Sequence, residues 1–194
     1  PYLMAAVQLL DEGHPPAAID EAAEAFGMPM GPLVLADAVG LDICLHVGEI
    51  LGGMMGGGSG WQPPKGLLRL IEQGHLGRKS GQGFYRYDKP GKPIKAKPQA
   101  SSAAPAELQD RLLLPLLNTC VACWREKLVE DADLVDAGLI FGAGFAPFRG
   151  GPIHYLESAD APDAKAMHAK LKAFAGRHGP LYEPDPGWES LLHA

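Results

Sequence analysis

Two short segments of the chain combine residue types that could bind a ligand. The first, residues 77–85, reads Gly-Arg-Lys-Ser-Gly-Gln-Gly-Phe-Tyr, so two cations, a hydroxyl and glycine amides lie close together. Groups of this kind bind phosphate or carboxylate. The alternative is a tight turn whose glycines need unusual backbone angles and whose charged side chains are merely solvated. The composition of the segment leaves both interpretations open.

The second segment is Met28-Pro29-Met30-Gly31-Pro32. Methionine side chains are unbranched and polarizable, so two of them beside a helix start could line an adaptable apolar pocket. The alternative is that both methionines are core residues around the turn that enters the next helix. Taken by itself, the segment favours the core interpretation over the pocket.

No other motif completes a reaction centre or a metal site. Cys120 and Cys123 have the spacing of a redox or zinc pair, but they lie in a helical run of leucines without a second ligand pair. His46 and Glu49 are three residues apart, and no second histidine–carboxylate pair has similar spacing. The glycine-rich segment 52–60 lacks the Gly-Lys-Ser/Thr ending of a phosphate loop. We expect small core cysteines, a flexible connection, and no catalytic, metal or cofactor residue in the chain.

The composition limits the class of protein. Of 194 residues, 46% are hydrophobic, which is enough for a sizeable core. A formal net charge of −6 argues against a nucleic-acid surface, which is normally basic. No apolar run reaches the roughly 20 residues that span a bilayer, and three cysteines are too few for a disulfide framework. We expect a cytoplasmic chain with no membrane span and no nucleic-acid partner.

Apolar residues recur at helical spacing along most of the sequence. We expect one long helix from Pro32, because proline suits a first helical turn. The apolar residues that this helix carries are Leu35, Val39, Ile43, Val47 and Ile50. Further helices are expected over 1–12, 19–26, 65–73, 108–130, 133–141, 152–158 and 162–178. Residues 84–87 alternate aromatic and polar side chains, which predicts an extended segment.

The two halves of the chain repeat the same order of elements. In the first half, a helical run leads through Ile19-Asp20-Glu21-Ala22 to the turn at 26–32, Phe-Gly-Met-Pro-Met-Gly-Pro. In the second half, a helical run leads through Val135-Asp136 to the turn at 145–152, Phe-Ala-Pro-Phe-Arg-Gly-Gly-Pro. A duplicated helical unit normally buries one half against the other.

The sequence therefore predicts an all-α fold of two tandem, pseudo-repeated helical subdomains that pack together. The first subdomain is expected over residues 1–88 and the second over 106–194. Residues 89–105, rich in Pro, Lys, Ala and Ser, are expected to be the linker between them. The chain opens at Pro1 inside a helical pattern, so we expect it to be a piece of a longer chain.

These motifs, taken in order, resemble the C-terminal helical region of 3-hydroxyacyl-CoA dehydrogenases. The resemblance is to the duplicated form found in the α subunit of the multifunctional fatty-acid oxidation enzyme, and it covers nearly the whole chain. The matching segments are 19–22, 27–32, 37–42, 77–85 and 150–152, followed by Tyr155. The fold that the resemblance implies is of the type of the 6-phosphogluconate dehydrogenase C-terminal domain.

The resemblance also implies where a substrate would bind. In this family an N-terminal Rossmann-type domain binds NAD and carries the catalytic histidine and glutamate, and neither that domain's Gly-x-Gly-x-x-Gly motif nor its general base is present here. The helical region closes over acyl-CoA and forms subunit contacts. The residues implied to bind substrate are Met28, Pro29, Met30, Lys79, Ser80, Gly81, Gly83 and Phe84. The first three would face the junction of acyl group and nicotinamide, and the others would lie near the domain junction.

The implied function is that of the substrate-binding and oligomerisation region of an NAD-dependent 3-hydroxyacyl-CoA dehydrogenase of fatty-acid β-oxidation. The implied partners are acyl-CoA, the chain's own Rossmann domain, and further copies or a thiolase-containing complex. The isolated chain is expected to be inactive. Two alternatives remain open: a non-catalytic helical interaction module, and the helical half of another dehydrogenase that acts on a sugar acid.

Overall fold

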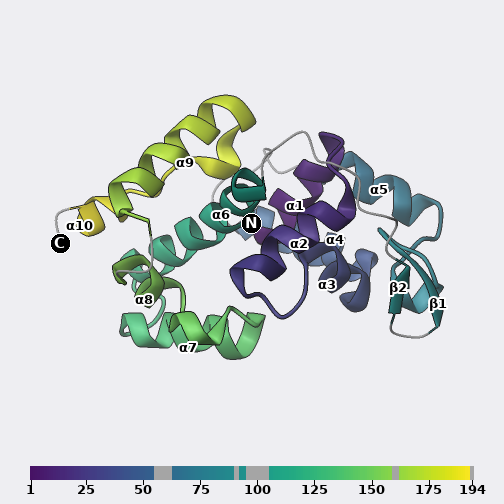
Figure 1. The fold of residues 1–194 in the computed structure, drawn as a ribbon, viewed down its shortest axis with the longest axis horizontal. Helices are drawn as coiled ribbons and strands as arrows, with labels where there is room; N and C mark the ends of the chain where they lie inside the picture. The colour runs from purple at the N-terminus through teal and green to yellow at the C-terminus, as the bar shows by residue number, and fades with distance from the viewer. Residues whose placement is uncertain (55–62, 90–91, 95–104, 159–161, 193–194) are drawn as a thin grey trace. The chain divides into compact units, whose positions relative to one another are not determined.

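The computed structural model describes residues 1–54, 63–89, 92–94, 105–158 and 162–192. Within these ranges the chain is almost entirely helical, which confirms the all-α prediction (Figure 1). The strands that occur there form one small two-stranded antiparallel sheet. None of the helices in these ranges combines the length and the apolar character that a bilayer-spanning segment needs.

The elements follow one another along the chain with short connections. Up to Ile94 they are α1 (Tyr2–Asp11), α2 (Pro16–Phe26), α3 (Pro32–Val39), α4 (Leu41–Met54), α5 (Lys65–Glu72), the 3-10 helix η1 (Arg78–Ser80), β1 (Arg86–Lys89) and β2 (Lys92–Ile94). The rest are α6 (Pro105–Arg125), α7 (Ala132–Ala143), η2 (Pro147–Arg149), α8 (Pro152–Glu157), α9 (Ala164–His178), η3 (Pro180–Tyr182) and α10 (Trp188–Leu192).

The predicted long helix from Pro32 is wrong, because the chain forms two helices there. Gly40 has φ +109°, a conformation that only glycine adopts readily, and it separates α3 from α4. The apolar residues expected on that helix therefore do not form one continuous stripe. Four of them are 45–48% exposed: Val39, Ile43, Val47 and Ile50.

The small sheet lies where the sequence predicts an extended segment followed by a linker. β1 pairs with β2 in antiparallel register, with Arg86 opposite Ile94. β2 therefore begins inside the predicted linker, so that part of 89–105 has regular structure. The remainder of the predicted linker, 95–104, and most of the glycine-rich segment 52–60 lie outside the described residues.

The chain divides into two compact units that do not coincide with its two halves. Unit 1 consists of Pro1–Ala5, Glu24–Pro29 and Gln109–Ala194. Unit 2 consists of Ala6–Ala23 and Met30–Leu108. The last turn of α2 and the turn that follows it thus belong to the same unit as the second half of the chain.

Phe26, the last residue of α2, is the aromatic centre of this part of unit 1. Its ring makes edge-to-face contacts with Phe145, at a centroid distance of 5.6 Å, and with Tyr155, at 5.2 Å. All three side chains are buried. Aromatic pairs in this arrangement are stabilised beyond the effect of their buried area. The turn at 27–29 therefore starts from a rigid anchor.

Each repeat caps its third helix with a buried aspartate from its second helix. In unit 2, the Leu33 amide at the start of α3 donates to Asp20 Oδ1 at 2.8 Å. In unit 1, the Ile153 amide at the start of α8 donates to Asp136 Oδ1 at 2.6 Å, and the His154 amide donates to Oδ2 at 3.0 Å. These carboxylates satisfy amides that a helix start leaves unpaired. The repeat seen in the sequence is thus also a repeat of hydrogen bonding.

Candidate functional site

In unit 2, the segment 77–85 is organised around the buried carboxylate of Asp37. Asp37 lies on α3 and accepts hydrogen bonds from the amides of Phe84 and Tyr85, both at 2.9 Å. Its Oδ2 also accepts a hydrogen bond from the Tyr87 hydroxyl at 3.1 Å. Three donors from one segment converge on this side chain, so Asp37 fixes the path of the chain into β1.

Two glycines allow the segment to approach Asp37 this closely. A Cβ at Gly83 would collide with Asp37 Oδ1, and a Cβ at Gly77 would collide with the Asp37 carbonyl oxygen. Gly77 also has φ +95°, and Gly81 has φ +79°. These backbone angles favour glycine. The tight-turn interpretation of the segment therefore explains three of its glycines.

Burial raises the pKa of Asp37 above its ordinary value, although the amides of Tyr85 and Phe84 and the Tyr87 hydroxyl oppose this shift. Removal from water destabilises the charged form of a carboxyl group, whereas donors that point at it stabilise that form. Burial and the nearby charge of Asp37 raise the pKa of the Tyr87 hydroxyl in turn. The group is an anchor with little solvent contact rather than a carboxylate exposed to a reactant.

Lys79 and Ser80, both predicted to bind substrate, have partners within unit 2. Lys79 Nζ lies 2.6 Å and 2.7 Å from the two carboxylate oxygens of Asp42, and both side chains are partly exposed. This hydrogen bond lowers the pKa of Asp42. The Ser80 hydroxyl accepts a hydrogen bond from the Leu76 amide at 2.8 Å and lies 2.8 Å from the Gln82 carbonyl oxygen. Their positions are thus explained by contacts within the turn, and a contact with substrate stays a proposal.

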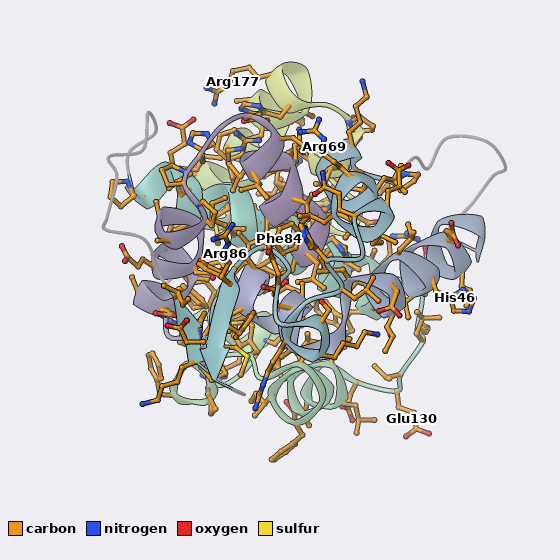
Figure 2. The ribbon with its side chains drawn as sticks, turned by 90° about the vertical axis from the view of Figure 1, so that its right-hand side faces the viewer. His46, Arg69, Phe84, Arg86, Glu130 and Arg177 are labelled. Atoms are coloured by element: carbon orange, nitrogen blue, oxygen red, sulfur yellow. The ribbon has the colours of Figure 1, made fainter. Side chains whose placement is uncertain are left out.

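The other predicted residues of this segment lie beside these two. Gly81 is exposed and Phe84 is half-buried. Figure 2 shows Phe84 and Arg86 on the part of the chain that leads into the hairpin. The structure therefore brings five of the predicted residues together in one turn: Lys79, Ser80, Gly81, Gly83 and Phe84.

The remaining predicted residues, Met28, Pro29 and Met30, form the turn between α2 and α3. Met28 belongs to unit 1 and is 6% exposed, as the core interpretation expects. Pro29, also in unit 1, is exposed, and a Cβ at Gly144 would lie 3.2 Å from its Cγ. Met30 begins a segment of unit 2 and is 40% exposed. The core interpretation therefore fits one methionine and not the other.

Sequence reasoning missed two residues that hold this turn, Phe148 and Arg149. Arg149 Nε donates to the Phe26 carbonyl oxygen at 2.8 Å, and its guanidinium lies 4.1 Å from the centroid of the Phe26 ring. The same guanidinium lies 5.2 Å from the centroids of the Phe148 and Tyr155 rings. The repeat contained the signal, because these two residues occupy the second copy of the turn.

The expected absence of metal and redox chemistry was examined in the described ranges. There, no group of three histidine, cysteine, aspartate or glutamate side chains is placed to hold a metal ion. His46 lies at the outer surface of α4, well away from Phe84 in Figure 2. Cys120 and Cys123 are free thiols of α6, and burial raises the pKa of Cys120 to about 12. A thiol with this pKa is protonated at neutral pH and is a poor nucleophile.

A helical domain with a duplicated motif, tight glycine turns and buried aspartate caps is the class that the structure defines. The model of the family "3-hydroxyacyl-CoA dehydrogenase, C-terminal domain" matches residues 1–87. This part of the chain belongs to that family, as the sequence motifs predict.

Relatives extend the similarity to the rest of the chain. The fatty acid oxidation complex subunit alpha of Idiomarina loihiensis is 34% identical over an alignment that covers 99% of this chain and 28% of that protein. The corresponding subunit of Shewanella putrefaciens is 34% identical, with 94% and 27% covered. The chain thus spans about a quarter of the length of these relatives.

Solved structures support the fold. The dehydrogenase part of multifunctional enzyme 1 from C. elegans superposes with a TM-score of 0.67 at 21% identity, covering 98% of this chain and 46% of that one. The 3-hydroxybutyryl-CoA dehydrogenase from Escherichia coli K12 gives a TM-score of 0.75 at 15% identity, covering all of this chain and 58% of that one. At these identities the likeness concerns the fold alone.

Proposed function

We propose that this chain is the helical, substrate-side region of an NAD-dependent 3-hydroxyacyl-CoA dehydrogenase of fatty-acid β-oxidation. The observation that carries the proposal is the similarity of 99% of the chain to the α subunit of a fatty acid oxidation complex. The proposed parent reaction is the reversible oxidation of a 3-hydroxyacyl-CoA to the 3-oxoacyl-CoA, with transfer of a hydride to NAD.

The residues of this chain do not fit the binding of NAD. A dinucleotide normally binds where a parallel strand turns into a helix through a glycine-rich loop. In the described part of the chain the strands form a single antiparallel hairpin, and none of the helices begins in such a loop. We therefore assign the cofactor and the general base to the part of the full-length protein outside this chain.

The role left to this chain is to bind and orient the acyl-CoA and to exclude water from the reaction. Holding a reactant in a productive geometry contributes to catalysis without any chemical step by the residues that hold it. We propose that Met28, Pro29 and Met30 contact the acyl group. We propose that the turn Lys79–Phe84 lies near the CoA or the neighbouring domain.

The proposal includes an arrangement and a setting. We propose that residues 1–88 and 106–194 are the two copies of the duplicated helical domain, joined by 89–105. The relatives are subunits of fatty acid oxidation complexes, which favours assembly with a thiolase-containing complex or with further copies of the chain. We propose a cytoplasmic location for the full-length protein.

The proposed function predicts that activity requires more than this chain. The purified fragment and the full-length protein that contains it are each mixed with acetoacetyl-CoA and NADH, and the loss of NADH absorbance is followed. We expect turnover by the full-length protein and a rate for the fragment equal to that of buffer. Activity in neither protein would favour the interaction module or a different substrate. Activity in the fragment would place the chemistry in this chain and contradict the proposal.

The proposed acyl contact predicts a kinetic effect of charge at Met30. In the full-length protein, Met30→Asp is expected to lower kcat/KM for a 3-oxoacyl-CoA by about tenfold or more, because a charge beside an acyl group is poorly solvated. Ile94→Asp is the control, since Ile94 is 44% exposed and Met30 is 40% exposed. Unchanged kinetics of a folded Met30→Asp protein would remove Met30 from the acyl site.

A further inference from the structure

Phe148 is a large apolar side chain held at the surface of unit 1. Its side chain is 75% exposed, yet a Cβ built at Gly27 would lie 2.5 Å from two of its ring carbons, Cε1 and Cζ. The ring therefore rests directly on the backbone of the turn that continues into Met28 and Pro29. Gly27 has φ +117° and no side chain, and both features make room for the ring.

Arg149 keeps the turn that carries Phe148 against Phe26. Its Nε–H donates to the Phe26 carbonyl oxygen, and its guanidinium lies over the Phe26 ring and near the Phe148 ring. Guanidinium groups over aromatic faces are attracted by the ring electrons. At a second point, a Cβ at Gly144 would be only 3.2 Å from Pro29 Cγ. The turn of the second repeat is thus pressed onto the turn of the first at two places within unit 1.

Phe141 provides the comparison within the same unit. It lies in the last turn of α7 and is 89% exposed, and no ring or cation contact is found for it among the described residues. An exposed ring without such contacts loses conformational freedom when a ligand covers it, whereas a ring that is already fixed does not. Phe148 is therefore better prepared than Phe141 to bind an apolar group.

We propose that Phe148 is a specificity-determining residue, whose ring forms an apolar wall for the acyl chain of the substrate beside Met28 and Pro29. The inference rests on the proposed function, which places the acyl group at this turn. The acyl chain is the occupant that fits, because the ring adjoins the proposed acyl-binding turn and offers it hydrocarbon surface only. A longer acyl chain covers more of that surface and gains more from it. The second repeat thus takes part in choosing the substrate.

The test uses the full-length protein and two substrates that differ only in chain length, acetoacetyl-CoA and 3-oxohexadecanoyl-CoA. NADH oxidation gives kcat/KM for each. For Phe148→Ala we expect kcat/KM to fall about tenfold or more with the long substrate and less than about threefold with the short one. Phe148→Leu keeps much of the apolar bulk and should show a smaller loss in the same direction. Phe141→Ala should leave both values unchanged.

The outcomes separate this inference from the proposed function. If the unaltered protein oxidises NADH with neither substrate, the proposed function fails and takes the inference with it. If the unaltered protein is active but Phe148→Ala lowers both values equally or lowers neither, the inference alone is wrong. The same selective loss in Phe141→Ala would also overturn it. Should Phe148→Ala fail to fold, Phe148→Leu decides by the same criterion of chain-length dependence.

Discussion

Gly151→Ala is expected to lower the free energy of unfolding by about 3 kcal/mol or more. Gly151 has φ +111°, and a Cβ there would collide with Cβ and Cγ of Asp136, the carboxylate that caps α8. The new methyl group would have to displace the cap as well as strain the backbone. The capped amides of Ile153 and His154 would then lose their partner in a buried place. Urea unfolding followed by circular dichroism measures the change.

The chain offers a matched control for this glycine. Gly138 lies in the interior of α7, and a Cβ there meets nothing within 4 Å. Gly138→Ala should therefore raise the stability by about 0.5–1 kcal/mol, because alanine is the better helix former. Gly31→Ala repeats the first experiment in the other unit, since a Cβ at Gly31 would collide with Asp20. An unfolding midpoint of Gly151→Ala equal to that of the unaltered chain would contradict the role of the cap.

Asp37→Asn is expected to destabilise the chain by about 2–3 kcal/mol. The carboxylate accepts hydrogen bonds from two amides at separate oxygens, and an asparagine offers one oxygen and turns an NH2 group toward the other amide. The exposed pair of Asp42 with Lys79 provides the control, and Asp42→Asn should change stability little because solvent screens that pair. Amide hydrogen exchange at Phe84 and Tyr85 should rise in the first variant only.

The pH dependence of Asp37 gives a second measurement on the same variant. Burial raises its pKa, so between the ordinary and the raised value the folded chain holds a proton that the unfolded chain releases. Stability from this group is therefore greatest at the acidic end and falls as pH rises through the raised pKa. The difference in unfolding free energy between Asp37→Asn and the unaltered chain should change across this range. A difference that stays constant would mean that Asp37 does not titrate as its burial implies.

Local signals in the sequence were enough for most elements of the fold. Prolines at the first helical positions of α3 and α8 mark both helix starts correctly. The repeat of aspartate, aromatic turn and Gly-Pro predicts two helical copies, and the paired caps of Asp20 and Asp136 share its order. The break at Gly40 was missed because an apolar pattern continues across it, while the reason for the break is a backbone angle.

The anchors of the candidate site could not be found in this way, because their contacts join distant parts of the chain. Asp37 holds amides that lie 47 and 48 residues later. Arg149 binds the carbonyl oxygen of a residue 123 positions earlier. Spacing patterns report on neighbours along a helix or strand, and neither contact leaves a trace at that range. The sequence did indicate the turns themselves, through their glycines and prolines.

The division into units bears on how a duplicated chain ages in evolution. Unit 1 draws on residues 1–5 and 24–29 as well as on everything from Gln109 onward. A single break or deletion anywhere between residues 30 and 108 would therefore leave unit 1 divided between two polypeptides, or incomplete. Copies that keep separate cores can be lost one at a time, whereas copies that share a core are selected together. The second copy in this chain is thus an inherited obligation of the first rather than a spare.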